Sequence, residues 1–112
     1  MIMYDEQLLT EFNVACDKVS TALDILEKSL QPYKVFASIK IKHKSIASLD
    51  WAKCVDQWKV LAVDRGGAFR PLSDMSLTER VEMLGYLDQL PPLVMTNMRN
   101  LLSLINKSAA KI

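Results

Sequence analysis

The spacing of apolar residues changes at Pro32, and this change is the strongest constraint on the fold of the 112-residue chain. Before Pro32, apolar residues recur every three or four positions, which predicts one long N-terminal helix. After it, apolar and polar residues alternate over residues 35–42, which predicts a β-strand. The helical stripe consists of Leu8, Phe12, Ala15, Val19, Ala22, Leu26 and Leu30. A chain that switches period in this way is expected to be α+β.

Two apolar runs after the first strand predict a β-hairpin. Residues 49–55 and 58–63 would turn at Asp56-Gln57, which places Val55 opposite Trp58 and Lys53 opposite Val60. One side of this hairpin would then be apolar and would face the first helix. It carries Leu49, Trp51, Val55, Trp58, Val60 and Ala62. The two tryptophans form either a core pair or a binding platform, and the core is favoured because they bury so much area.

A glycine-rich segment separates this hairpin from the C-terminal third. Arg65-Gly66-Gly67 predicts a turn, and residues 68–72 can add a short edge strand that ends at Pro71. The sheet is therefore expected to be a three-stranded, or with this segment four-stranded, antiparallel β-meander. A phosphate site at the same glycines is disfavoured, because the spacing matches no phosphate-binding loop and does not open a helix.

Two C-terminal helices complete the predicted fold. Ser76 and Glu79 form a capping-box pattern that begins the first of them. Pro91-Pro92 interrupts the helical pattern, and a last helix is expected over residues 92–107. Val94, Met98, Leu101 and Ile105 lie on one face of that helix, with Leu102 beside them. The length fits a single α+β domain over residues 1–112.

The net charge of +1 conceals alternating charged blocks. Residues 1–32 sum to −4, residues 33–60 to +4, residues 61–90 to −2 and residues 91–112 to +3. Such blocks are expected to pair within the fold or to face different partners. The acidic N-terminus does not resemble a secretory signal, and no segment is long and apolar enough to span a membrane. The protein is therefore expected in the cytoplasm, with Cys16 and Cys54 as free thiols.

The residues that usually carry enzyme chemistry are scarce. A metal site needs three or four converging ligands, and His43, the only histidine, stands among lysines that would repel a cation. A His43–Cys54 pair could activate a thiol only if neighbouring strands brought the two side chains together. The carboxylates are expected to be solvated rather than buried as general acids. We therefore predict no catalytic residues, no metal, no cofactor and no enzymatic activity.

The strongest local signal is the alternation of lysines in residues 39–44. Lys40, Lys42 and Lys44 would line one face of a strand near Phe36, an arrangement with which sheets bind single-stranded nucleic acid. The same lysines could instead be solvated and protect an edge strand from aggregation. They could also pair with the acidic face of the first helix from another subunit. Arg65 and Arg70 would extend a nucleic-acid contact.

The region Leu49–Leu93 resembles small proteins encoded by bacterial phages and prophages. The residues that carry the resemblance are Leu49-x-Trp51-x-Lys53, Trp58 with Val60, Pro71-Leu72, Arg80, Leu87, Leu90 and Leu93. The resemblance implies an accessory protein of a mobile element acting in a bacterial cell, and it implies no catalytic residues.

The length of the first apolar stripe leads to the principal functional expectation. One small sheet is too short to cover a stripe that runs from Leu8 to Leu30, and an excess apolar stripe is commonly buried in a dimer. We therefore expect a non-enzymatic interaction protein that self-associates as a homo-oligomer. The predicted association face is Leu8, Phe12, Ala15, Val19 and Leu26. A nucleic-acid-binding accessory protein that uses the lysine-rich strand is the alternative.

Overall fold

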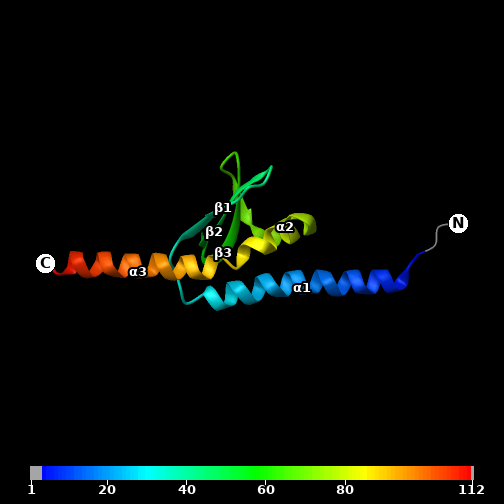
Figure 1. Cartoon of the computed structure of the whole chain (residues 1–112), viewed down its shortest axis with the longest axis horizontal. Helices are drawn as coiled ribbons and strands as arrows, with labels where there is room; N and C mark the ends of the chain where they lie inside the picture. Colours follow the sequence, from blue (N-terminus) through cyan, green and yellow to red (C-terminus); the bar gives the residue numbers. More distant parts are fainter. Residues whose placement is uncertain (1–3, 112) are drawn as a thin grey trace.

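The computed structural model describes residues 4–111, and within them the chain forms an antiparallel sheet and three α-helices. The order is α1 (Glu6–Leu30), β1 (Ala37–Lys40), β2 (Ile46–Cys54), β3 (Gln57–Asp64), β4 (Phe69–Pro71), the 3₁₀ turn η1 (Leu72–Asp74), α2 (Leu77–Leu87) and α3 (Leu90–Ala109) (Figure 1). The predicted α+β fold, with its long first helix and two C-terminal helices, is confirmed.

The four strands pair in sequence order, so the sheet is the predicted meander in its four-stranded form. β1 and the three-residue β4 are its two edges. The first strand is shorter than the alternation predicts, because it ends at Lys40 and the chain then enters the connection to β2. Lys42 and Lys44 therefore lie in this connection rather than on a strand.

The β2–β3 hairpin turns one residue earlier than predicted, at Val55-Asp56. Trp51 therefore pairs with Val60, whereas the predicted turn would have put Lys53 there. A shift of two residues in register leaves every side chain on its predicted face. The exception is Val55, which was predicted on the apolar face but lies in the turn with 87% of its surface exposed. Its φ of 60° is one that β-branched residues rarely adopt, so sequence preferences point away from this turn.

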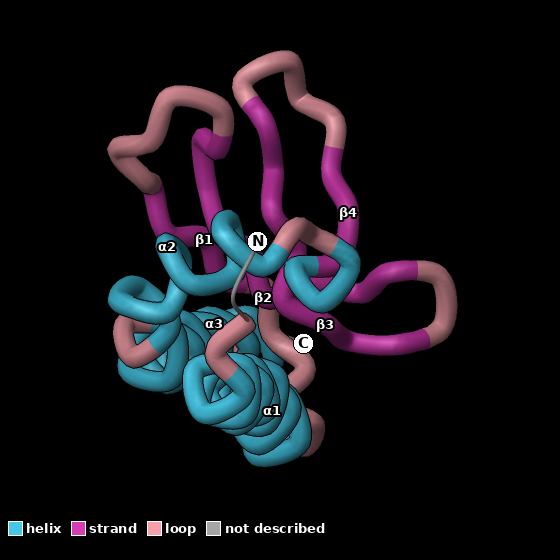
Figure 2. Tube along the Cα trace, turned by 90° about the vertical axis from the view of Figure 1, so that its right-hand side faces the viewer, coloured by secondary structure: helices cyan, strands magenta, loops and turns pink. Residues whose placement is uncertain are grey.

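All three helices pack on the same face of the sheet, and Figure 2 shows α1 and α3 nearly end-on, on one side of the strands. The core joins helical residues to one face of β1, β2 and β3. Its helical members are Leu23, Leu30, Met83, Leu87, Leu90 and Val94, and its strand members are Ala37, Ile39, Leu49, Trp51, Val60 and Ala62. Strand side chains alternate between faces, so Ser38 and Lys40 lie on the opposite face. No helix of the described residues 4–111 packs on that face.

Trp51 lies at the centre of this core and is fully buried. Its indole Nε1–H donates a 2.8 Å hydrogen bond to the carbonyl oxygen of Tyr33, in the segment that links α1 to β1. The ring of the half-buried Trp58 lies against it, with 5.9 Å between centroids and a tilt of 40°. The two tryptophans therefore form the predicted core pair, and Trp51 ties the end of α1 to the sheet.

Side-chain caps explain where α1 and α2 begin. The carboxylate of Asp5 accepts a 3.0 Å hydrogen bond from the backbone N–H of Leu8, and the hydroxyl of Ser76 accepts one from that of Glu79. The predicted start at Ser76 is thus confirmed. Pro91 and Pro92 do not precede α3 but lie in its first turn. Backbone N–H groups in a first turn have no acceptor within the helix, so the missing N–H of proline costs no hydrogen bond there.

The molecule is elongated, with extents of 78 × 29 × 24 Å. Its radius of gyration is 17.9 Å, whereas a compact domain of this length has about 13 Å. Figure 1 shows the cause: α1 projects past the sheet on one side, and α3 projects past it on the other. Over residues 4–111, no helix has both the length and the hydropathy that a membrane span requires.

Candidate functional site

The first helical projection is the N-terminal part of α1. Every residue from 5 to 15 is exposed, and we call this segment the α1 arm. Leu8, Leu9 and Phe12 have between 53% and 62% of their surface exposed. The arm also carries Asp5, Glu6 and Glu11 and no basic residue. It is therefore an amphipathic, acidic helix with no covering layer in the described structure.

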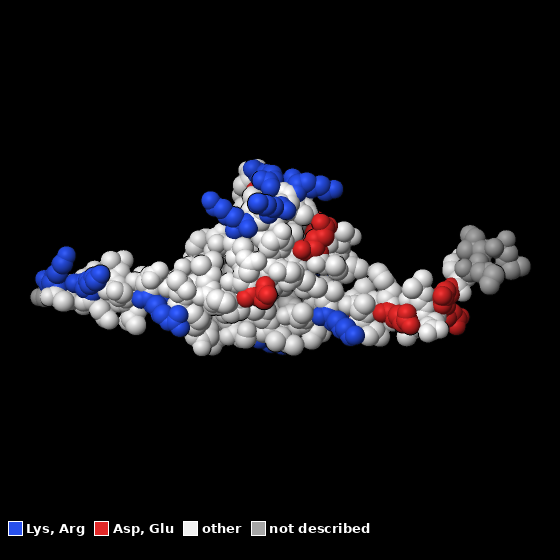
Figure 3. All heavy atoms as spheres, viewed as in Figure 1, with Lys and Arg blue, Asp and Glu red and all other residues white. Residues whose placement is uncertain are grey.

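The second projection is the C-terminal part of α3. Every residue from 99 to 111 is exposed, and we call this segment the α3 arm. Its large apolar side chains are 44–60% exposed and comprise Leu101, Leu102, Leu104 and Ile105. Its charged residues are Arg99, Lys107 and Lys111, with no acid among them. In Figure 3 the tip of the α1 arm carries acidic side chains and the tip of the α3 arm carries basic ones.

We call the sheet, together with the helical segments that pack on it, the body of the molecule. The apolar face of each arm continues the helix face that packs on the sheet in the body. In α1 the apolar positions that are buried or half-buried are three or four residues apart, and the same spacing leads back to Phe12 and Leu8. They are Cys16, Val19, Leu23, Leu26 and Leu30. In α3 the buried Leu90 and Val94 lead on to Leu101 and Ile105 by the same rule. Each stripe is therefore longer than the sheet that covers it.

The five residues of the predicted association face fall into two groups, one packed in the body and one exposed on the α1 arm. Leu26 packs against the core of its own chain, and Val19 is half-buried. Leu8, Phe12 and Ala15 are exposed on the α1 arm. These three remain for contact with another chain.

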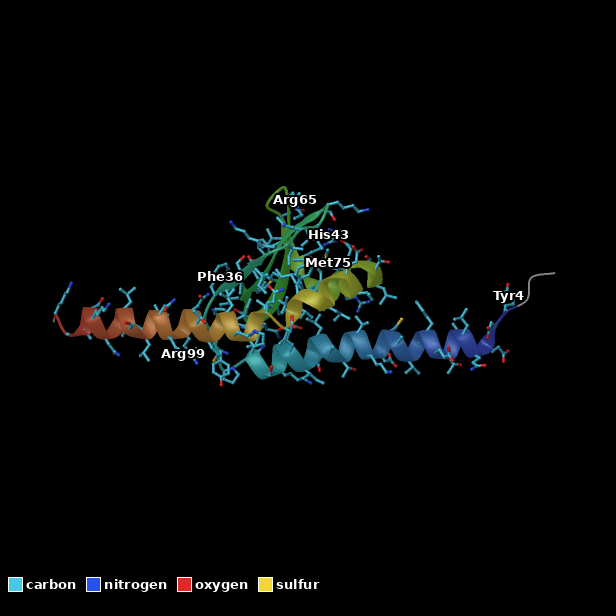
Figure 4. The ribbon with its side chains drawn as sticks, viewed as in Figure 1. Tyr4, Phe36, His43, Arg65, Met75 and Arg99 are labelled. Atoms are coloured by element: carbon cyan, nitrogen blue, oxygen red, sulfur yellow. The ribbon has the colours of Figure 1, made fainter. Side chains whose placement is uncertain are left out.

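A second candidate surface is the basic end of the sheet, which we define as Lys40, Lys42, Lys44 and Arg65. Lys42 and Lys44 lie in the β1–β2 connection, and Arg65 lies in the β3–β4 turn. The guanidinium of Arg65 donates to the carbonyl oxygen of His43, through Nε at 2.9 Å and also through Nη2. This contact brings the two loops together, and both labelled residues lie at the same end of the sheet in Figure 4.

His43 organises the loop that carries these lysines. Its Nδ1 accepts hydrogen bonds from the backbone N–H groups of Ser45 and Ile46, at 3.1 and 3.2 Å. Because Nδ1 is an acceptor, Nε2 carries the proton and donates to the Glu82 carboxylate on α2 at 2.9 Å. His43 is therefore a structural residue. His43 precedes the first residue of β2, whereas Cys54 is the last residue of that nine-residue strand. The two residues therefore lie at opposite ends of β2, and the fold does not bring them together.

Arg70 does not join the basic end. It pairs with Ala62, which belongs to the helix-covered face of the sheet, whereas Lys40 projects from the other face. Arg70 instead lines a pocket of about 390 Å³ together with Asp64, Met75 and Glu79. In that pocket the Glu79 carboxylate already accepts a 2.8 Å hydrogen bond from Ser76.

The carboxylate of Glu27 is half-buried where α1 meets β3. Burial raises the pKa of Glu27, while a 2.8 Å hydrogen bond from the backbone N–H of Val60 and the charge of Lys59 act to lower it, and Asp24 acts to raise it. This hydrogen bond gives the carboxylate a partner within the fold and links α1 to β3. Among residues 4–111, no three His, Cys, Asp or Glu side chains come close enough to hold a metal ion.

The α3 arm is the part of the candidate surface that sequence reasoning missed. Two signals for it were present: the +3 charge of residues 91–112 and the apolar face that includes Leu101 and Ile105. Neither signal shows how far the sheet extends along the helix, so both fit an ordinary packed helix equally well. The resemblance to phage and prophage proteins stays a prediction. A comparison of the chain with protein-family models, with curated proteins and with solved structures finds no match.

Proposed function

We propose that this protein is a non-enzymatic interaction protein that associates with a second copy of itself through its helical arms. The observation that carries the proposal is that both apolar stripes continue beyond the sheet, on helical segments that nothing within residues 4–111 covers. The proposal includes the setting that the resemblance implies, an accessory protein of a phage or mobile element in the bacterial cytoplasm.

Two physical arguments support association. Isolated helices of about ten residues are marginally stable in water, so each arm gains stability if another helix covers it. Each half-exposed Leu, Ile or Phe would contribute about 1 kcal/mol when fully covered. The seven large apolar side chains named on the two arms therefore offer enough burial for a stable contact.

The test is the mass of the protein in solution, measured by sedimentation equilibrium at micromolar concentration. We expect the wild-type chain to sediment with at least twice the mass of one chain. The double variant Leu8→Ser/Phe12→Ser removes two apolar anchors of the α1 arm, about 2 kcal/mol, and is expected to weaken association roughly thirtyfold.

The matched control is Val14→Ser/Ile25→Ser. Both side chains are at least half exposed on α1, but helical geometry places them away from the stripe. This variant should associate like the wild-type chain. A wild-type mass equal to that of one chain would refute the proposal.

A second candidate function, binding of nucleic acid, is favoured by the contact that gathers Lys42, Lys44 and Arg65 at one end of the sheet. If it holds, Lys40→Glu/Lys42→Glu/Lys44→Glu weakens binding to oligonucleotides at least tenfold and lowers the salt slope by about two to three. Fluorescence anisotropy over a salt series measures both quantities. Lys18→Glu/Lys34→Glu/Lys53→Glu carries the same charge change on scattered exposed sites, and equal effects of the two variants would exclude a site at the basic end.

A further inference from the structure

The two arms are complementary in charge and similar in length. The α1 arm carries three acidic residues and no basic one, and the α3 arm carries three basic residues and no acidic one. Their helical parts span residues 6–15 and 99–109, which corresponds to about 15 Å each. Each arm therefore carries three charges that are opposite in sign to the three on the other arm.

Both arms also present an apolar stripe beside these charges. Leu8, Leu9 and Phe12 form the stripe of the α1 arm, and Leu101, Leu104 and Ile105 form that of the α3 arm. Helices that pair in water combine such a stripe with flanking charges, which select the partner. Apolar burial supplies affinity in such a pair, and the charges decide which helix is accepted.

The two arms of one chain cannot pack against each other. They project from opposite ends of a molecule that is 78 Å long (Figure 1). Pairing two α1 arms would place three acids against three acids, and pairing two α3 arms would place bases against bases. The basic end of the sheet consists of the last residue of β1, Lys40, and of loop residues, and it offers no helical apolar stripe to an incoming α1 arm.

We infer that the α1 arm of one copy packs along the α3 arm of a second copy, with acidic residues against basic ones. This inference rests on the proposed self-association and specifies how the arms are matched. The complementary partner of each arm is present in every copy, so the protein needs no other component to assemble.

Exchange of charge between the arms tests this pairing. Variant A, Glu6→Lys/Glu11→Lys, makes both arms basic while keeping the Asp5 cap. Variant B, Arg99→Glu/Lys107→Glu, makes both arms acidic. We expect each variant alone to associate at least tenfold more weakly than the wild-type chain, whereas an equimolar mixture forms a mixed assembly with affinity within threefold of wild type. Sedimentation of the mixture, with only variant A fluorescently labelled, reports the mixed species.

Two controls carry the same charge changes elsewhere on the surface. Asp56→Lys/Asp74→Lys matches variant A, and Lys42→Glu/Lys44→Glu matches variant B. Both are expected to associate like the wild-type chain. Loss of association in Lys42→Glu/Lys44→Glu alone would overturn the inference, because the acidic arm would then be bound to the basic end of the sheet.

The outcomes distinguish failure of the arm pairing from failure of the self-association on which it rests. A wild-type chain that sediments as a single copy refutes self-association itself. If the wild-type chain associates and variants A and B each associate equally well, the protein self-associates but the pairing of acidic with basic arms is refuted. A mixture that does not recover association refutes the match as well, while recovery shows that both variants are folded.

Discussion

Replacement of Trp51 by alanine is expected to cost about 4 kcal/mol of folding free energy. The side chain is fully buried in the core that the sheet shares with the helices, so the change opens a cavity there. It also removes the hydrogen bond that the indole N–H donates to the carbonyl oxygen of Tyr33, so the segment between α1 and β1 is held less firmly. Small domains are stable by about 5–15 kcal/mol, so the variant would be close to unfolding.

Thermal unfolding followed by circular dichroism, at one fixed protein concentration, measures this effect. A loss of about 4 kcal/mol corresponds to a fall in Tm of roughly 15 °C for a chain of this size. Trp58→Ala is the matched comparison, because Trp58 touches the same ring but is only half-buried. We expect it to lower Tm by less than half as much. Equal shifts would contradict the placement of Trp51 at the centre of the core.

Dilution of the wild-type protein below its association range is expected to remove roughly a third of its helical circular dichroism signal. The helices have 25, 11 and 20 residues, and the arms hold residues 6–15 and 99–109 of that total. Without a covering helix these residues lose the apolar contacts that offset the entropy of ordering them. The body keeps its core, so its helical signal persists.

The measurement is ellipticity at 222 nm over a dilution series, beside the near-ultraviolet signal of the two tryptophans. The near-ultraviolet signal should stay constant, because Trp51 and Trp58 pack in the core and not on the arms. Leu8→Ser/Phe12→Ser, which weakens association, should show the low-helicity signal at every concentration. Helicity that stays constant while the sedimenting mass falls to one chain would show that the arms are helical without a partner.

The order and faces of the secondary-structure elements could be predicted because they depend on local spacing. The stripe from Leu8 to Leu30 fixes the first helix, and the alternation around Ile39 fixes the first strand. The hairpin register was predicted wrongly by two residues. No glycine or asparagine marks its turn, and the observed turn puts Val55 at a backbone conformation that sequence preferences disfavour.

The candidate site could be predicted only in part, because its limits depend on where the sheet ends. Periodicity places Leu8 and Leu26 on one stripe, yet the first is exposed on the arm and the second packs on the core. Likewise Arg70 and Lys40 were grouped by charge, although strand geometry puts them on opposite faces. Which apolar residues are left uncovered is a property of tertiary packing, and it is not encoded in any one segment.

The elongated shape has a consequence for how the mass of this protein must be determined. A rod-like particle experiences more friction than a sphere of equal mass, and here the long dimension is 78 Å against 29 and 24 Å. A single 12.7 kDa copy would therefore elute early from a gel-filtration column, at the position of a larger compact protein. An elution volume alone would imitate a dimer. Methods that weigh particles independently of their shape, such as sedimentation equilibrium or light scattering, distinguish a long single copy from a true pair.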